Sequence, residues 1–403
     1  MRYLASFFGF LFFTLSCGNS VIKKERKGNV TKEIIKIDTI FEKLKMGADN
    51  FVRYLPLLAE KKVGIVTNQS GLLSDGTHVV DFLLLKSIDV KRIFSPEHGF
   101  RGNADAGEPI KDGKDSKTDL PIISLYGDNK KPKQDQLKGI DVMVFDLQDV
   151  GSRFYTYISS LHYVMEACAE NNITLIVLDR PNPNGKIVDG PVLEKEFTSF
   201  VGMHPIPVLH GMTIGEYAKM INGEKWLKNN IHCELIVIPC LNYSRTMAYD
   251  LPAKPSPNLP NAQAVNLYAS LCFFEGTNVS VGRGTEKQFQ IYGSPFLPKR
   301  KFSFIPTPNI GAKNPMHKDA LCYGEDLSSV YKIKQLELKW LLKAYNETFD
   351  KAKFFNSFFV KLAGTRKLQE QIKLGVSEKE IRNSWKEGLK KFKTMRASYL
   401  IYN

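Results

Sequence analysis

The chain has 403 residues, of which 43% are hydrophobic and 24% are charged. This length exceeds what one hydrophobic core usually organises, and the composition excludes a largely disordered chain, so a globular protein of two domains is expected. The net charge of +14 is uneven, because residues 297–403 hold 22 Lys and Arg against 10 Asp and Glu. This basic third either faces an anionic polymer or a charged envelope surface, or forms an ordinary solvated helix face.

The N-terminus predicts export. Arg2 precedes an apolar run over residues 4–15, which has the length of a secretory signal and is too short to span a bilayer. Ser16-Cys17 then resembles the cleavage box of bacterial lipoproteins. We expect residues 1–17 to be a signal peptide, Cys17 to carry a lipid, and residues 18–45 to tether the protein in the cell envelope, facing the periplasm. The alternative is ordinary signal cleavage with release.

Short apolar runs alternate with helical periods from residue 63 onward. These runs are continuous in Val, Ile and Leu, as in strands whose two faces are both covered. Strands of this kind separated by helices predict a parallel sheet, so residues 46–265 are expected to form a Rossmann-like α/β domain. The predicted strands are residues 63–67, 90–94, 141–146, 174–179 and 234–238, and the predicted helices are residues 77–85, 155–170 and 213–221.

A proline-rich stretch follows this domain. Residues 251–261 contain four prolines, which exclude regular structure and predict a hinge. Beyond it lie a glycine-rich loop and two amphipathic helical stretches, residues 336–347 and 378–392. We expect residues 266–403 to be a smaller α+β domain.

Several kinds of site lack their motifs. No G-x-G-x-x-G follows the first strand, and the single Gly-Arg-Gly around Arg283 is too short to predict a dinucleotide site. G-x-S-x-G, H-E-x-x-H and C-x-x-C are absent, so neither a serine hydrolase elbow nor a metal is expected, and no cofactor is predicted. Nucleic acid is a poor partner for an exported chain without a recognisable binding motif. Buried free thiols are expected at Cys168, Cys233, Cys240, Cys272 and Cys322, with one disulfide as the alternative.

Polar side chains follow the predicted strands. Asn68 follows the first, Glu97 the second, Asp146 and Asp149 the third, and Asp179 the fourth. Because the carboxyl ends of parallel strands meet at one edge of the sheet, these residues are expected to form a polar rim that binds a ligand. The alternative for each residue is turn and capping chemistry.

The chemistry that remains for this rim is carboxylate chemistry. Glycoside cleavage needs a protonated acid beside the leaving oxygen and often a second carboxylate. Glu97 is the predicted acid, and His98 and Arg101 follow it closely enough to tune it and to contact the substrate. The candidates for the second carboxylate are Asp146, Asp149 and Glu275. Capping roles are the alternatives for Glu97 and for one of the two aspartates.

Five motifs resemble the exo-acting β-N-acetylmuramidases, a family of glycoside hydrolases. They lie at residues 64–71, 95–102, 145–157, 178–183 and 274–278, in the order of the family. The resemblance implies a Rossmann-like domain, a smaller second domain, and an active cleft between them that works without nicotinamide. It implies release of N-acetylmuramic acid from the non-reducing ends of peptidoglycan fragments. The family's catalytic glutamate falls on Glu97, whereas the second catalytic group carries over no firm assignment.

The residues also suit a muramyl saccharide. N-acetylmuramic acid carries a lactyl carboxylate, with which a guanidinium can form a bidentate pair. Arg153 and Arg283 are the candidates, each with a structural salt bridge as the alternative. Tyr155 can pack on a sugar ring, although a tyrosine at a helix start is as often part of the core. The leading hypothesis is an envelope-anchored exo-muramidase, and its alternatives are a non-catalytic lipoprotein that binds muropeptides and a carboxylate-dependent hydrolase of another sugar.

Overall fold

The computed structural model describes residues 43–97, 99–100 and 112–403. The predicted signal peptide, Cys17 and the tether up to residue 42 lie outside the described residues, as do His98 and Arg101. The chain divides into residues 1–44 and a compact unit of residues 45–403, which contains everything that follows. No helix in the described ranges is both long enough and apolar enough to cross a membrane.

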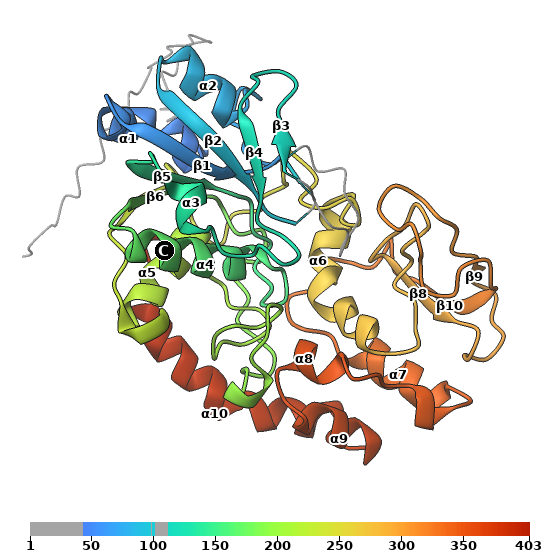
Figure 1. Cartoon of the computed structure of the whole chain (residues 1–403). Helices are drawn as coiled ribbons and strands as arrows, with labels where there is room; N and C mark the ends of the chain where they lie inside the picture. The colour runs from blue at the N-terminus through green and yellow to red at the C-terminus, as the bar shows by residue number, and fades with distance from the viewer. Residues whose placement is uncertain (1–42, 98, 101–111) are drawn as a thin grey trace, which may run out of the picture. The chain divides into compact units, whose positions relative to one another are not determined.

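A seven-stranded sheet of order β3-β4-β2-β1-β5-β6-β7 forms the centre of the first half (Figure 1). All neighbouring strands are parallel except β3 and β4 at one edge. The strands are β1 (Lys62–Thr67), β2 (Asp89–Ser95), β3 (Gly113–Lys114), β4 (Pro121–Ser124), β5 (Val142–Asp146), β6 (Thr174–Leu178) and β7 (Leu235–Ile238). The predicted Rossmann-like sheet is therefore confirmed, with β3 and β4 as strands that the sequence did not indicate.

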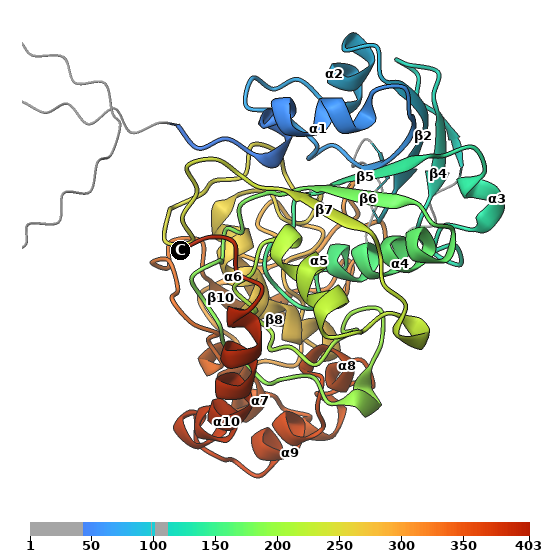
Figure 2. The same cartoon turned by 90° about the vertical axis from the view of Figure 1, so that its left-hand side faces the viewer.

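Helices cover both faces of this sheet (Figure 2). On one face α1 (Phe51–Leu58) and α2 (Val79–Leu85) pack against Ile65 and Val144. On the other face α4 (Tyr157–Glu170) and α5 (Ile214–Gly223) pack in the cluster that contains Val66 and Phe145. Successive strand residues thus point to opposite apolar layers, which explains why the strands are continuously hydrophobic. The short α3 (Gln134–Leu137) precedes β5.

The second half contains a small antiparallel sheet of order β8-β10-β9. Its elements are α6 (Ala262–Leu271), β8 (Ile291–Ser294), β9 (Ser303–Phe304), β10 (Cys322–Asp326), α7 (Lys339–Glu347), α8 (Phe359–Ala363), α9 (Lys367–Lys373) and α10 (Glu378–Ala397). Short 3-10 helices lie at Gly47–Asp49, Lys195–Phe197, Lys228–Asn230, Cys272–Gly276 and Lys351–Lys353. One hydrophobic cluster contains Leu161 of α4 as well as Leu341 of α7 and Trp385 of α10, so a single core runs through both predicted domains.

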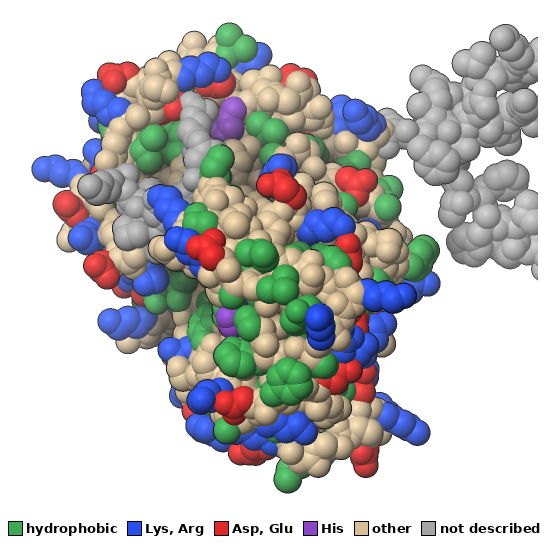
Figure 3. Space-filling model, turned by 90° about the vertical axis from the view of Figure 1, so that its right-hand side faces the viewer, with side chains coloured by type: hydrophobic (Ala, Val, Ile, Leu, Met, Phe, Trp, Pro, Cys, Tyr) green, Lys and Arg blue, Asp and Glu red, His purple; other side chains and the backbone are tan. Residues whose placement is uncertain are grey.

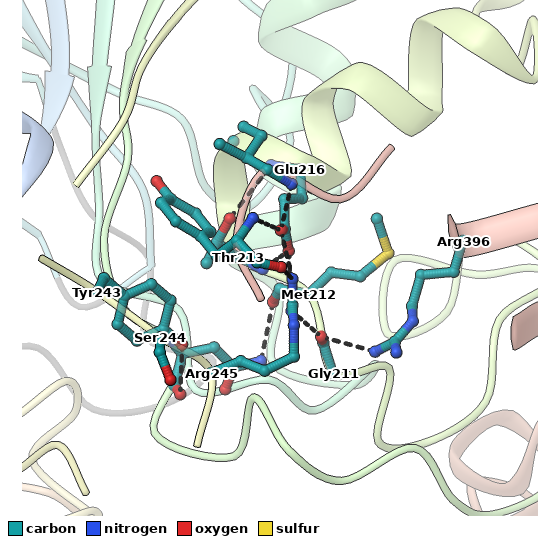
Figure 4. Close-up of polar contacts among 12 residues, drawn as sticks. Gly211, Met212, Thr213, Glu216, Tyr243, Ser244, Arg245 and Arg396 are labelled. Atoms are coloured by element: carbon teal, nitrogen blue, oxygen red, sulfur yellow. Dashed lines mark hydrogen bonds and ion pairs between the residues drawn. The ribbon is translucent and has the colours of Figure 1, made fainter. Parts of the chain in front are cut away.

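The last residues of the chain return to the first sheet. The buried carboxylate of Glu216 accepts hydrogen bonds from the amides of Ile401 and Tyr402, and it pairs with Arg245 at 2.6 Å. Figure 4 shows this pair beside Thr213, the N-cap residue of α5, and Gly211, whose carbonyl oxygen accepts from both Arg245 and Arg396. The C-terminus is therefore part of the packing of the Rossmann-like half.

Two expectations from composition can be compared with the surface and the core. All five cysteines in the described ranges are buried and free, as predicted. On the face that carries the small antiparallel sheet, Lys and Arg are interspersed with acidic and apolar side chains and form no continuous basic patch (Figure 3).

Candidate active site

A cavity of about 470 Å³ is lined by residues from both halves of the chain. This volume lies within the range of sites for small ligands. The first half contributes the ends of loops that follow β2 and β4 together with the start of α4, and the second half contributes α6, the 3-10 helix Cys272–Gly276 and the loop before β8. Polar lining residues are Glu97, Tyr126, Thr156, Ser256, Asn258, Glu275, Ser280, Arg283 and Asn314, and aromatic ones include Phe154, Tyr155, Tyr157, Phe200, Tyr268, Phe289 and Phe358.

The Glu97 carboxylate is held at both oxygens. The Tyr126 hydroxyl donates to Oε1 at 2.9 Å, and the Thr156 hydroxyl donates to Oε2 at 2.9 Å. Thr156 is the N-cap residue of α4, yet its side chain makes no capping hydrogen bond. A threonine at this position ordinarily satisfies a helix amide. Here the hydroxyl serves Glu97 instead, so the start of α4 orients the carboxylate.

A second layer supports Glu97 from behind. Tyr157 lines the cavity, and its hydroxyl donates to the backbone carbonyl oxygen of Glu97 at 3.4 Å while it accepts from Asn68 Nδ2 at 2.6 Å. Asn68 is completely buried and does not line the cavity, so it supports the loop that carries Glu97 through its bond to Tyr157. The Tyr155 ring lines the cavity, but its hydroxyl donates to the carbonyl oxygen of Pro255 at 2.7 Å.

Glu275 and Arg283 form an ion pair on the part of the cavity that the second half supplies. Arg283 Nε donates to Glu275 Oε1 at 2.7 Å, and both side chains are a little over one-fifth exposed. The thiol of Cys272 donates to the other Glu275 oxygen at 3.3 Å. Of the predicted acidic residues in the described ranges, Glu97 and Glu275 line this cavity.

Asp146 and Asp179 lie instead in buried structural networks, because each is fully enclosed and carries strong partners. Arg180 pairs bidentately with Asp146, with Nε–Oδ1 at 2.6 Å and Nη2–Oδ2 at 2.8 Å. Asp179 accepts from the hydroxyls of Tyr402 at 2.6 Å and Thr213 at 2.7 Å, and burial raises its pKa to about 6. Neither residue lines the cavity, and their positions favour the alternative of turn and capping chemistry.

Arg153 is also placed away from the cavity. Its guanidinium is completely buried and donates at 2.8 Å to the carbonyl oxygens of Pro191, Ile206, Leu362 and Ala363. Those four carbonyl groups belong to loops of the first half and to α8 of the second half, so Arg153 joins the two halves. Burial lowers its pKa to about 9. This position favours a structural role over the predicted contact with substrate.

Asp149 is buried below the rim. Its Oδ2 accepts from the amide of Gly151 at 2.6 Å and lies 3.7 Å from Nε2 of His210. Burial raises the pKa of Asp149 to about 7 and lowers that of His210 to about 3, so the pair is neutral under mildly acidic conditions. Asp149 does not line the cavity, and its carboxyl is a structural group in this geometry.

Replacing Asp149 with Asn should change the pH dependence of stability. The unfolded carboxyl ionises near pH 4, whereas the folded one keeps its proton up to about pH 7, so wild-type stability falls as the pH rises between these values. The asparagine side chain does not titrate and can still accept from the Gly151 amide. Urea unfolding at pH 5 and pH 8 should show the wild type losing about 3 kcal/mol relative to the Asp149→Asn variant. Parallel pH profiles for the two proteins would contradict this assignment.

Two important site residues were not predicted from the sequence. Tyr126 follows β4, whose short and half-exposed pattern gave no strand signal. Thr156 lies within the motif at residues 145–157, but a threonine before a helix is interpreted first as a cap. No group of three or more His, Cys, Asp or Glu residues in the described ranges is arranged to hold a metal ion.

Known proteins resemble this chain along most of its length. The family model described as Exo-beta-N-acetylmuramidase NamZ, N-terminal, matches residues 63–263, and the corresponding C-terminal model matches residues 266–402. The Peptidoglycan beta-N-acetylmuramidase NamZ of Bacillus subtilis (strain 168) is 38% identical over 393 residues, which cover 89% of this chain and 92% of that protein. These matches confirm the resemblance that the five motifs indicated.

Solved structures agree with the fold. A DUF1343 family protein from Bacteroides fragilis NCTC 9343 superposes with a TM-score of 0.84 at 43% identity, covering 90% of this chain and 99% of that chain. A second DUF1343 family protein from the same organism superposes with a TM-score of 0.75 at 28% identity, covering 89% and 99%.

Proposed function

Since the chain belongs to the NamZ family of exo-β-N-acetylmuramidases and is thereby a glycoside hydrolase, we propose that Glu97 is the general acid that frees N-acetylmuramic acid from the non-reducing ends of peptidoglycan fragments. One observation carries this proposal. Glu97 lines the cavity with both carboxylate oxygens fixed by hydroxyl groups. A carboxyl group that is already held in one position loses little conformational entropy when it donates its proton to the glycosidic oxygen.

The proposed step moves one proton. The carboxyl proton of Glu97 passes to the glycosidic oxygen, and the bond between C1 and that oxygen breaks with its electron pair going to the oxygen, which leaves Glu97 ionised. Water then adds to C1 of the muramyl group, and the proton that this water loses restores the carboxylic acid of Glu97 directly or through solvent. Hydroxyl groups can donate to a carboxylate and can rotate to accept from a carboxylic acid, so Tyr126 and Thr156 can serve both forms.

The other proposed contacts with the sugar come from aromatic residues that line the cavity. The hydroxyl of Tyr155 is engaged with Pro255, so its ring is the part left to pack against the sugar. Asn68 acts through Tyr157, which holds the backbone of Glu97. We also propose that His98 and Arg101, which follow Glu97 in the sequence, tune this carboxyl group and contact the substrate.

We further propose that Cys17 anchors the protein in the cell envelope, facing the periplasm, where peptidoglycan fragments are present. The apolar run and the Ser-Cys junction at the N-terminus support this proposal. A Cys17→Ala variant should leave the membrane fraction, and a variant that stayed there would contradict the anchor.

Activity on a chromogenic N-acetylmuramide tests the proposed function. Turnover with release of N-acetylmuramic acid supports it. Binding without turnover would support the alternative of a muropeptide-binding lipoprotein, and turnover only of a different glycoside would support a hydrolase of another sugar. Either of these two results would overturn the proposal.

A further inference from the structure

The guanidinium of Arg283 is fixed at one edge and open at the other. Its Nε donates to Glu275, and its Cζ lies 5.3 Å from the centre of the Phe289 ring, which adds a cation–π contact. No residue in the described ranges accepts a hydrogen bond from its two terminal nitrogens. The side chain lines the cavity, so this unused fork is available to a ligand there.

The backbone around Arg283 is constrained by the two flanking glycines. Gly282 and Gly284 have φ values of +77° and +79°, which disfavour any residue with a side chain. A Cβ atom at Gly284 would lie 2.6 Å from the carbonyl oxygen of Thr307, and one at Gly282 would lie 2.5 Å from the side chain of Ile291. The Gly-Arg-Gly sequence, which carries no weight as a dinucleotide motif, is thus a tight loop that presents one arginine.

Glu275 holds Arg283 through an ion pair. One of its oxygens accepts from Arg283 Nε and the other accepts from the Cys272 thiol. The salt bridge uses the negative charge of Glu275 to hold the Nε edge of the Arg283 guanidinium. The Cys272 thiol holds the other oxygen of Glu275, so the carboxylate and the guanidinium are fixed relative to each other.

We propose that Arg283 reads the lactyl carboxylate of the muramyl group and that Glu275 is its positioning residue, not the second catalytic carboxylate. This inference rests on the proposed function and deepens it, because it assigns the selectivity of the same cavity. The lactyl group is what distinguishes N-acetylmuramic acid from N-acetylglucosamine. A planar fork of two N–H donors matches a carboxylate in geometry and charge, and such charge-assisted pairs are the stronger hydrogen bonds.

The arrangement also separates the two negative charges. Glu275 contacts the Nε edge, so the guanidinium itself lies between Glu275 and a ligand carboxylate at the terminal nitrogens. Arg153 is excluded from this role because it is completely buried and already donates to four carbonyl oxygens.

Direct binding tests the role of Arg283 without any need for turnover. Calorimetry should show that the wild type binds free N-acetylmuramic acid about 100-fold more tightly than its lactyl methyl ester or N-acetylglucosamine. Arg283→Met should remove most of that ratio, and Arg283→Lys, which keeps the charge but loses the fork, should retain a smaller part of it. Arg300→Met is the matched control, because Arg300 is also 22% exposed and paired with glutamates, Glu325 and Glu347, but lies outside the cavity lining. An unchanged ratio in both folded Arg283 variants would overturn the inference.

Two substitutions at Glu275 test the positioning role. Glu275→Ala should raise KM for an N-acetylmuramide about tenfold or more, with a smaller change in kcat. Glu275→Gln keeps an acceptor for Arg283 Nε and should restore KM to near the wild-type value. A loss of kcat in Glu275→Gln by about 10³-fold or more, at unchanged KM, would show a catalytic carboxylate and would overturn this assignment. Failure of the proposed function is distinguishable, because the wild type would then turn over no N-acetylmuramide at all.

Discussion

Replacing Glu97 with Gln is expected to lower kcat on a muramyl disaccharide by about 10²–10⁴-fold, the range that general acid catalysis contributes. The glutamine side chain can still accept the Tyr126 hydroxyl hydrogen bond, but it has no acidic proton to give to the leaving oxygen. KM should change little, because the shape of the cavity and its other polar groups are retained. Steady-state kinetics on the purified variant measures both quantities.

A matched control separates this effect from a general loss of structure. Glu194 is exposed, accepts a hydrogen bond from the Thr365 hydroxyl at 2.8 Å, and does not line the cavity. Glu194→Gln should therefore keep the wild-type kcat and the wild-type unfolding transition. Equal losses of kcat in the two variants would contradict a specific role for Glu97.

Replacing Arg245 with Met is expected to destabilise the protein by about 3–5 kcal/mol, because it leaves a buried carboxylate without its cation. The side chain of Glu216 is fully buried and that of Arg245 is 10% exposed. The same pair holds the C-terminal residues, since Arg245 Nη2 also donates to the carbonyl oxygen of Tyr402. Denaturant unfolding measures the loss in the free energy of unfolding.

Two further variants define what the Arg245 result means. Lys287→Met removes an exposed partner of Asp326 and should cost no more than about 1 kcal/mol, as exposed ion pairs do. Combining Arg245→Met with Glu216→Gln should recover part of the loss, because the orphaned charge is then gone. A double variant no more stable than Arg245→Met alone would contradict the account of the pair as a charge interaction.

The sheet of the first half was predictable because strands that are buried on both faces appear in the sequence as continuous hydrophobic runs. The runs that became β1, β5 and β6 are continuous in aliphatic residues, and the structure places them at the sheet centre. β4 is short and half-exposed, so its sequence contains no such hydrophobic run. α6 begins directly after the proline-rich stretch, where proline gave the stronger signal and concealed the helix.

The site was predictable only in part, because strand ends carry two kinds of polar residue. Glu97 lines a cavity, whereas Asp146 and Asp179 hold the chain through partners that lie far away in sequence. Tyr402, which binds Asp179, is 223 residues further along the chain. No local pattern reveals such a partner. The same limit applies to Tyr126, which meets Glu97 through the pairing of β2 with β4.

The dependence of the Glu97→Gln effect on the leaving group tests the central claim most directly. The 2,4-dinitrophenolate group of a 2,4-dinitrophenyl N-acetylmuramide is stable enough to leave without protonation. The sugar hydroxyl that leaves from the natural disaccharide needs a proton. If Glu97 is the proton donor, the variant should lose kcat/KM strongly on the disaccharide and by less than about tenfold on the dinitrophenyl substrate. An equal loss on both substrates would contradict the account.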